Sequence, residues 1–371
     1  MNADAERKSA RIFSHSRLIY DIINSISNQI NVPEGGLSMY QANEKRYEQM
    51  PYHRCGNSGL KLSALALGLW QNFGHESNIA QMEQICRTAF DHGITYFDLA
   101  NNYGYPYNGT AELNFGTILK KGLGQYRNEL CIATKAGYDM WPGPYGTKNG
   151  CRKYLITSLE DSLKRMDLDY VDIFYHHVYD PETPLEETAL ALDQVVRQGK
   201  ALYVGISNYN QEQTKKIAKI FKELKTPFIV NQPSYSILNR WIEDDGLKNF
   251  AEQNGIGLAV YSPLSQGLLT SRYLDGVPED SRYYKANTGL KQKLTQEMKI
   301  RLIELNFLAQ KRGQTLSQMA IAWLLQDKAI TSVIIGASRP EQVEENVKAL
   351  ENLQFNAQEL KEIYILATQK I

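Results

Sequence analysis

Three consecutive strand-like segments of this chain each end on an ionisable residue. Asp98 ends the run at 94–98, Lys135 follows the run at 130–134, and His176-His177 follow the run at 171–175. A charged group at the end of a buried strand is costly unless it meets a partner. In barrels of parallel strands, catalytic residues come from the ends of several strands at one face. The segments therefore predict a barrel whose ionisable residues meet at one rim.

Strand-like and helix-like segments alternate over most of the 371 residues. Alternation of this kind predicts a parallel α/β fold, and eight strands are the number that closes a TIM barrel. Two short runs around Asn57-Ser58-Gly59 predict a β-hairpin that plugs the bottom of the barrel. Long loops at 137–151 and 263–294 are expected on the functional face. The expected strands are 64–68, 94–98, 130–134, 171–175, 201–206, 228–231, 257–261 and 331–335, and the expected helices are 79–92, 111–121, 154–165, 185–198, 211–224, 247–253, 297–312 and 340–350.

Residues 1–38 differ in style from the rest, so we expect an N-terminal extension followed by one barrel domain at 39–371. Arg17 and Asp21 interrupt the apolar part of the extension, which argues against a secretory signal, and its acidic residues argue against a transit peptide. Glu34-Gly35-Gly36 can be encoded by a purine-rich ribosome-binding sequence just before Met39. The extension is therefore expected to be disordered or, in a bacterial source, a start-site artefact.

Composition excludes several classes of protein. Lysine plus arginine and aspartate plus glutamate are both 41, so no basic surplus favours nucleic acid or an anionic membrane. No apolar run approaches the ~20 residues that span a bilayer. The six histidines lack the spacing of metal ligands. The four cysteines form no CxxC pair, which is typical of reduced thiols in a cytoplasmic protein.

The chain resembles the aldo-keto reductases from about Tyr52 to about Leu350. Within that family, the segment at 137–146 and the lead from Met39 resemble the branch that holds bacterial L-glyceraldehyde 3-phosphate reductases and, as close relatives, the voltage-gated potassium channel β subunits. The motifs that carry the resemblance are Gly68-Leu69-Trp70, Phe97-Asp98-Leu99-Ala100-Asn101-Asn102-Tyr103-Gly104, Ala133-Thr134-Lys135, Val171-Asp172-Ile173-Phe174-Tyr175-His176-His177, Gly205-Ile206-Ser207-Asn208-Tyr209, Tyr261-Ser262-Pro263-Leu264 and Ile335-Gly336-Ala337-Ser338-Arg339.

The resemblance implies a catalytic tetrad of Asp98, Tyr103, Lys135 and His177. A free tyrosine, with a pKa of about 10, is a poor acid at neutral pH. We expect the cation of Lys135 to lower the pKa of Tyr103, and Asp98 to hold Lys135 charged. His177 would orient the substrate oxygen, and strand alternation would turn His176 to the opposite face. Channel β subunits carry asparagine at the histidine position, so His177 favours a working reductase.

Each of these residues also has an ordinary structural interpretation when it is taken alone. A strand-terminal aspartate is often a helix N-cap or turn residue, and a single lysine or tyrosine is usually solvated. Their joint occurrence at the ends of successive strands favours the functional interpretation.

No G-x-G-x-x-G motif follows a strand, which excludes a Rossmann module but not a nicotinamide bound on the barrel. The resemblance implies that Ser207, Asn208 and Gln232 bind the carboxamide and that Tyr261 stacks on the nicotinamide. The remaining cofactor residues that it implies are Leu69, Trp70 and Asp98 near the nicotinamide, Ser262, Pro263, Leu264, Ser265, Gly267, Arg272 and Arg282 along the pyrophosphate, and Gly336, Ser338, Arg339, Gln342, Glu345 and Asn346 at the adenosine end.

NADPH is the expected cofactor rather than NADH. Many relatives carry a lysine where this chain has Ala337 and an arginine near Gln342, so Arg339 alone remains to bind a 2′-phosphate. An ordinary capped helix is the alternative interpretation of this segment.

The resemblance implies reduction of small aldehydes to alcohols, such as L-glyceraldehyde 3-phosphate or methylglyoxal, with Tyr103 as proton donor. Substrate contacts are expected from Trp70, Tyr103, Trp141 and His177, although Trp141 could equally pack its own loop. The alternative function is an NADP-binding regulatory subunit. A homo-oligomer, tetrameric or larger, is a further possibility that the channel-like relatives raise.

Overall fold

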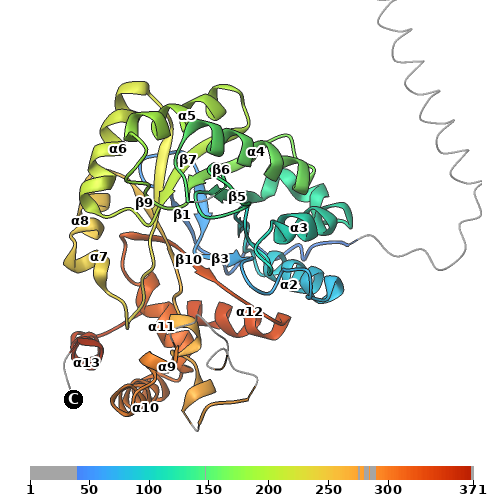
Figure 1. The fold of residues 1–371 in the computed structure, drawn as a ribbon. Coiled ribbons are helices and arrows are strands. Elements are labelled where there is room, and N and C mark those ends of the chain that lie inside the picture. Colours follow the sequence, from blue (N-terminus) through green and yellow to red (C-terminus); the bar gives the residue numbers. More distant parts are fainter. Residues whose placement is uncertain (1–39, 147, 275, 280–283, 285–289, 369–371) are drawn as a thin grey trace, which may run out of the picture. The chain divides into compact units, whose positions relative to one another are not determined.

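The computed structural model describes residues 40–146, 148–274, 276–279, 284 and 290–368. The predicted N-terminal extension at 1–38 lies outside these residues, as does Met39. Eight parallel strands close a barrel in the order β10-β3-β4-β5-β6-β7-β8-β9, with helices around it (Figure 1). The predicted barrel is thus confirmed. Its strands are β3 Leu65–Gly68, β4 Tyr96–Asp98, β5 Cys131–Ala136, β6 Val171–His176, β7 Ala201–Ser207, β8 Phe228–Gln232, β9 Gly257–Tyr261 and β10 Ile330–Ile335.

The predicted hairpin is also present. Strand β1 (Tyr52–Arg54) pairs with β2 (Lys61–Ser63) in antiparallel register. Cys55 and Leu62 of the hairpin are fully buried and belong to the cluster of side chains that fills the barrel interior. A Cβ atom on Gly257, at the start of β9, would lie 2.7 Å from Cys55 Sγ, so only a glycine lets the hairpin approach the amino end of that strand so closely. The hairpin therefore closes the amino end of the barrel.

The helices begin and end close to the predicted limits because the residues that cap them are their neighbours in the sequence. Asn210 and Gln213 form a capping box at the start of α6, and Asn78 caps α2. None of the described helices is long and apolar enough to cross a bilayer. The helices are α2 Ile79–Asp91, α3 Thr110–Lys120, α4 Arg152–Met166, α5 Leu185–Arg197, α6 Gln211–Leu224, α7 Trp241–Asp244, α8 Leu247–Gln253, α9 Leu290–Lys293, α10 Gln296–Lys311, α11 Leu316–Leu325, α12 Pro340–Val347 and α13 Ala357–Thr368.

Two helices of more than two turns were not expected from the sequence. Every residue of α11 is buried, so it has no polar face and shows no amphipathic period. Helix α13 packs on α10, where Arg312 forms an ion pair with Glu359 at 2.9 Å and lies 3.5 Å from the centre of the Phe355 ring. The C-terminal segment is thus held against α10.

Candidate active site

The carboxyl ends of β4, β5 and β6 carry the residues on which the sequence prediction depends. Asp98 is the last residue of β4, Lys135 lies near the end of β5, and His177 directly follows β6. Asp98 pairs in register with Ala133, two residues before Lys135. Because parallel strands end at one edge, the loop after β4 brings Tyr103 to the same rim.

Lys135 lies at the centre of this group. Its Nζ donates to Asp98 Oδ2 at 2.6 Å, to Leu99 O at 2.7 Å and to the Tyr103 hydroxyl at 3.3 Å. The side chains of Lys135 and Asp98 are almost wholly buried, at 0% and 3% exposure. Burial of an ammonium group requires such a full set of acceptors. The structure therefore brings Asp98, Tyr103 and Lys135 together.

The pKa of the Tyr103 phenol is shifted in the direction opposite to the one expected from the sequence. We expected the cation of Lys135 to lower the pKa of Tyr103, and that expectation is wrong: burial raises this pKa well above its usual range, and the charge of Asp98 raises it further. Asp98 lies close enough to Lys135 to offset its charge at the phenol. Burial likewise lowers the pKa of Lys135, against the opposing effect of Asp98. The phenol is thus neutral and carries its proton.

His177 and His176 point to different surroundings, as strand alternation predicts. The His177 ring lies edge-on to Tyr103, with 5.7 Å between ring centres, and 4.6 Å from the ring of Tyr138. His176 Nδ1 is instead 2.6 Å from the Tyr209 hydroxyl. Burial lowers the pKa of His177 well below 6.5, and the charge of Lys135 lowers it further, so His177 is neutral at neutral pH.

The buried His176 makes stability depend on acidity. Burial lowers its pKa to about 4, whereas the unfolded chain has a histidine pKa of about 6.5. Below that value the unfolded chain binds a proton that the folded protein does not, so the free energy of unfolding falls as pH drops. Between about pH 6.5 and pH 4, the buried His176 lowers the free energy of unfolding by roughly 3 kcal/mol in total. Urea unfolding of His176→Gln across this range should give a shallower pH slope than wild type, and an equal slope would contradict the assignment.

Two buried tyrosines beneath Asp98 were not singled out from the sequence. The Tyr96 and Tyr175 hydroxyls lie 2.8 Å apart, and Tyr96 donates to Asp98 Oδ1 at 3.4 Å. Gln232 Nε2 donates to the same oxygen at 2.8 Å. Both carboxylate oxygens of Asp98 are therefore hydrogen-bonded. The spacing held a signal, because Tyr96 stands two residues before Asp98 on one strand and so faces the same side.

The residues expected around a nicotinamide gather at the ends of β7, β8 and β9. The Tyr261 hydroxyl donates to Asn208 Oδ1 at 2.7 Å, and Ser207 Oγ donates to Gln232 O at 2.7 Å. Asn208 Nδ2 donates to His177 O at 3.1 Å, which joins this group to the tetrad. The amide nitrogen of Gln232 is engaged with Asp98, so its carboxamide role stays a prediction.

The loop after β9 has an unusual backbone. Ser262, Ser265 and Gln266 adopt left-handed conformations, with φ of 58°, 47° and 61°. Such conformations are uncommon outside glycine and gather at ligand sites. Ser265 Oγ lies 2.7 Å from Ser236 Oγ. Of the expected pyrophosphate residues, Pro263, Leu264 and Gly267 lie in this loop, Arg272 lies exposed in the 3₁₀ turn Ser271–Tyr273, and Arg282 falls outside the described residues.

Helix α12 begins after Arg339 without a side-chain cap, with Pro340 as its first residue. Gln342 Oε1 accepts from Ser338 N at 2.8 Å, and Glu345 accepts from Thr315 and Ser317 at 3.3 Å each. Arg339 is 59% exposed and lies 3.6 Å from Glu341. Gly336 precedes this turn, and Asn346 is buried within the helix. The alternative of an ordinary capped helix therefore finds no side-chain cap here, and the Arg339 guanidinium is exposed beside Glu341.

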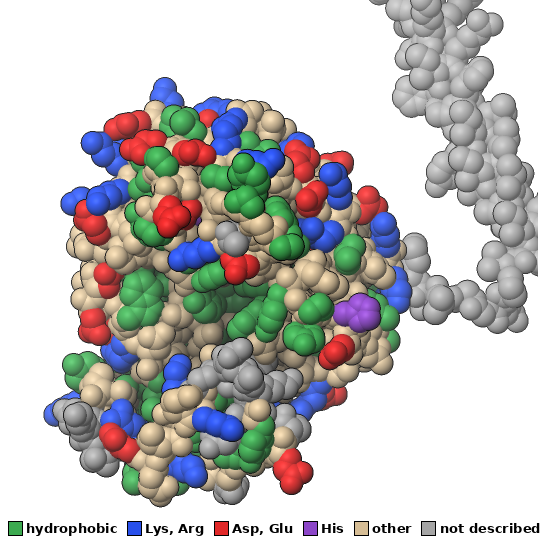
Figure 2. All heavy atoms as spheres, in the orientation of Figure 1, with side chains coloured by type: hydrophobic (Ala, Val, Ile, Leu, Met, Phe, Trp, Pro, Cys, Tyr) green, Lys and Arg blue, Asp and Glu red, His purple; other side chains and the backbone are tan. Residues whose placement is uncertain are grey.

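The expected substrate residues divide into two groups. Trp70 is 42% exposed and its ring centre lies 6.4 Å from that of Tyr103, while the preceding Leu69 is buried and donates its N–H to Asp98 O. Trp141 is half-buried and packs on Tyr154, with ring centres 5.4 Å apart, which attaches its loop to α4, and its substrate contact stays a prediction. Figure 2 shows hydrophobic side chains gathered around a hollow in the face drawn.

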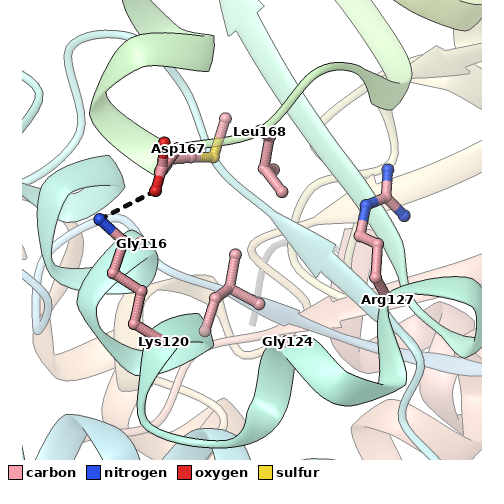
Figure 3. A pocket seen from close by; sticks show the side chains of 8 residues that line it. Gly116, Lys120, Gly124, Arg127, Asp167 and Leu168 are labelled. Carbon is pink, nitrogen blue, oxygen red and sulfur yellow. Dashed lines mark ion pairs between the residues drawn. The ribbon is translucent and has the colours of Figure 1, made fainter. Parts of the chain in front are cut away.

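A separate cavity of about 240 Å³ lies toward the amino ends of the strands, opposite the rim that carries these residues. It is lined by the end of α3, the 3₁₀ turn Leu123–Glu129 and the segment after α4, all of which lead into the amino ends of strands (Figure 3). Lys120 and Asp167 at its edge pair with each other at 2.9 Å. The described residues hold no cluster of ligands for a metal ion. The rim at the carboxyl ends of the strands is therefore the candidate active site.

The barrel and the group at its rim define a class of protein, and comparison with known sequences agrees. Residues 64–367 match the aldo/keto reductase family, so the chain belongs to that family and is an oxidoreductase. Members of the family use nicotinamide cofactors. The resemblance seen in the sequence is thus confirmed.

The chain is also similar to individual members of this family. The chain is 54% identical over 329 residues to the L-glyceraldehyde 3-phosphate reductase of Escherichia coli K12, covering 88% of this chain and 94% of that one. It is 36% identical to a probable voltage-gated potassium channel subunit beta of Arabidopsis thaliana, over 81% of this chain and 92% of the relative. A solved structure of a thermostable aldo-keto reductase with the inhibitor epalrestat is 30% identical, with a TM-score of 0.67 over 85% of this chain and all of that chain.

Proposed function

We propose that this protein reduces small aldehydes to alcohols with NADPH, and that Tyr103 donates the proton. The observation that carries the proposal is the buried contact of Lys135 Nζ with both Asp98 Oδ2 and the Tyr103 hydroxyl. A structural ion pair would not need a phenol from the rim loop as its third member.

The chain's own residues divide the chemistry among them. A reduced nicotinamide, when bound, would supply the hydride. Tyr103, held in its protonated state by burial, gives a proton to the substrate oxygen, and Lys135 at 3.3 Å stabilises the phenolate that remains. Asp98 offsets the charge of Lys135 within the barrel. Neutral His177 is able to hydrogen-bond the same oxygen and orient it.

The residues at the ends of β7 to β9 fit a nicotinamide. Asn208 and Ser262 both adopt left-handed conformations at the strand ends, where the chain must turn beside a ligand. Tyr261 presents a ring that is partly exposed, and its hydroxyl is fixed on Asn208. Aromatic stacking and amide hydrogen bonds are the contacts that a flat carboxamide ring accepts.

The substrate class follows from the relatives. The name of the Escherichia coli relative supports L-glyceraldehyde 3-phosphate, and methylglyoxal has the same small carbon skeleton. Two cations near the rim differ in how they could meet a substrate phosphate. Lys148 is exposed, whereas the Arg152 side chain donates to Leu190 O on α5. The names of the channel-subunit relatives support the alternative of a regulatory NADP-binding subunit. The resemblance implies asparagine at this position in channel β subunits, so His177 favours the reductase.

The proposal is tested by steady-state loss of NADPH absorbance with a panel of aldehydes, repeated with NADH. Turnover of glyceraldehyde 3-phosphate or methylglyoxal with NADPH is the expected result. Cofactor binding without turnover of any aldehyde would favour the regulatory alternative.

Preference for NADPH is expected to depend on Arg339. Arg339→Ala should raise the KM for NADPH about tenfold, because a charged hydrogen bond to the 2′-phosphate is lost, and should leave the KM for NADH nearly unchanged. Lys348→Ala, at the other end of α12, serves as the matched control. Equal effects of Arg339→Ala on both cofactors would refute the assignment.

We also propose a cytoplasmic location, supported by the four cysteines, all of which are free. A homo-oligomer remains a proposal that light scattering of the purified protein would test.

A further inference from the structure

Tyr138, in the loop after β5, lies against the proposed catalytic histidine. Its ring centre is 4.6 Å from that of His177, with the planes at 82°, and Tyr103 lies edge-on to the same histidine at 5.7 Å. The two tyrosines therefore both contact the His177 ring. Trp141, the residue of this loop expected to contact substrate, packs on Tyr154.

The backbone holds Tyr138 in this place from two sides. Gly137 has a φ of 156°, and a Cβ atom there would lie 3.1 Å from both Cβ and the backbone nitrogen of His177, so a side chain at this position would be strained and crowded against His177. On the other side, the hydroxyl of the buried Tyr154 donates to the carbonyl of Tyr138. Asn101 in turn donates to the Tyr154 hydroxyl at 3.1 Å. The position of Tyr138 is thus fixed by core residues.

The hydroxyl of Tyr138 is available to a ligand. No described residue forms a hydrogen bond with it, and the residue is 37% exposed. Burial and the neighbouring Tyr261 raise the pKa of Tyr138, and Tyr138 and Tyr261 both contribute to the raised pKa of Tyr103. The three phenol groups are therefore in electrostatic range of one another and all carry their protons.

These contacts give the site two polar positions. Tyr103 and His177 are assigned to the carbonyl oxygen in the proposed function. Because Tyr138 and Tyr103 contact the same His177 ring, we assign the Tyr138 side of that ring to a substituent one carbon further on. A phenol both donates and accepts a hydrogen bond, which matches an alcohol and does not match a methyl group. We infer that the Tyr138 hydroxyl binds the hydroxyl on the carbon next to the reacting carbonyl, and so selects 2-hydroxy aldehydes; this inference rests on the proposed reductase function.

The test compares lactaldehyde with propanal, which share a carbon skeleton and differ in the 2-hydroxyl. With the full chain and NADPH, Tyr138→Phe should lower kcat/KM for lactaldehyde about tenfold, because one hydrogen bond to substrate is lost, and leave kcat/KM for propanal unchanged. Tyr145→Phe is the control, since Tyr145 lies on the same loop, is 53% exposed and has Lys153 Nζ 5.1 Å from its ring centre. Tyr145→Phe should leave kcat/KM unchanged for both aldehydes.

The outcomes separate this inference from the function on which it rests. An unchanged ratio between the two aldehydes, or an equal fall for both, would overturn the role of Tyr138, because the ring would then only shield His177. Absence of turnover of every aldehyde in the panel by the wild-type protein would overturn the reductase proposal, and this inference with it. Turnover of other aldehydes without turnover of lactaldehyde would overturn this inference alone.

Discussion

Replacement of Tyr103 by phenylalanine is expected to lower kcat for aldehyde reduction by about a hundredfold to ten-thousandfold, the range for loss of a positioned general acid. The phenylalanine ring fills the same space beside His177 and Trp70, so cofactor and substrate should still bind. Steady-state kinetics with saturating NADPH and the best aldehyde of the panel would measure the loss. Titration of the cofactor by fluorescence should give an unchanged Kd.

Tyr105→Phe is the matched control for this substitution. Tyr105 lies two residues away in the same loop, is 55% exposed and packs its ring against Tyr107 rather than against the tetrad. Its loss of a hydroxyl should leave kcat unchanged. If Tyr103→Phe retained wild-type kcat, the proton would have another source and the proposed role of Tyr103 would be lost.

The sequence predicted the barrel well because strands and caps are local features. Strand β9 and helices α6 and α8 have the predicted limits, since Gly257, the Asn210 capping box and the flanking glycines all mark their ends. Helix α11 was missed for the opposite reason. Its ten residues are all buried, and a helix that is covered on every side has no polar stripe to reveal its period.

The convergence of Asp98, Lys135 and Tyr103 was also predictable, because parallel strands end at one rim. What the sequence could not supply was the balance of charge at that rim. The direction of the pKa shift of Tyr103 depends on whether burial and the charge of Asp98 outweigh the charge of Lys135. Burial and the distances between these groups are set only in the folded chain. The hydrogen bond from Gln232 to Asp98 is a further case, since 134 residues separate the two in sequence.

The ion pair of Lys135 and Asp98 should also be the most sensitive point for stability. Lys135→Met keeps the length of the side chain but leaves the Asp98 carboxylate buried without its cation. Removal of one partner of a buried pair typically costs about 3–5 kcal/mol. We therefore expect urea unfolding to report a loss of this size, together with a loss of aldehyde turnover.

The double variant Lys135→Met/Asp98→Asn separates charge from packing. It removes both charges, and asparagine can still accept from Gln232 Nε2 and Tyr96, which bind Asp98 Oδ1 at 2.8 Å and 3.4 Å in the wild type. Most of the lost stability should return, because no uncompensated charge is left in the buried site. Turnover should stay absent, because no ammonium remains to stabilise the Tyr103 phenolate. A double variant as unstable as Lys135→Met would show that packing around Lys135, rather than its charge, holds this rim of the barrel together.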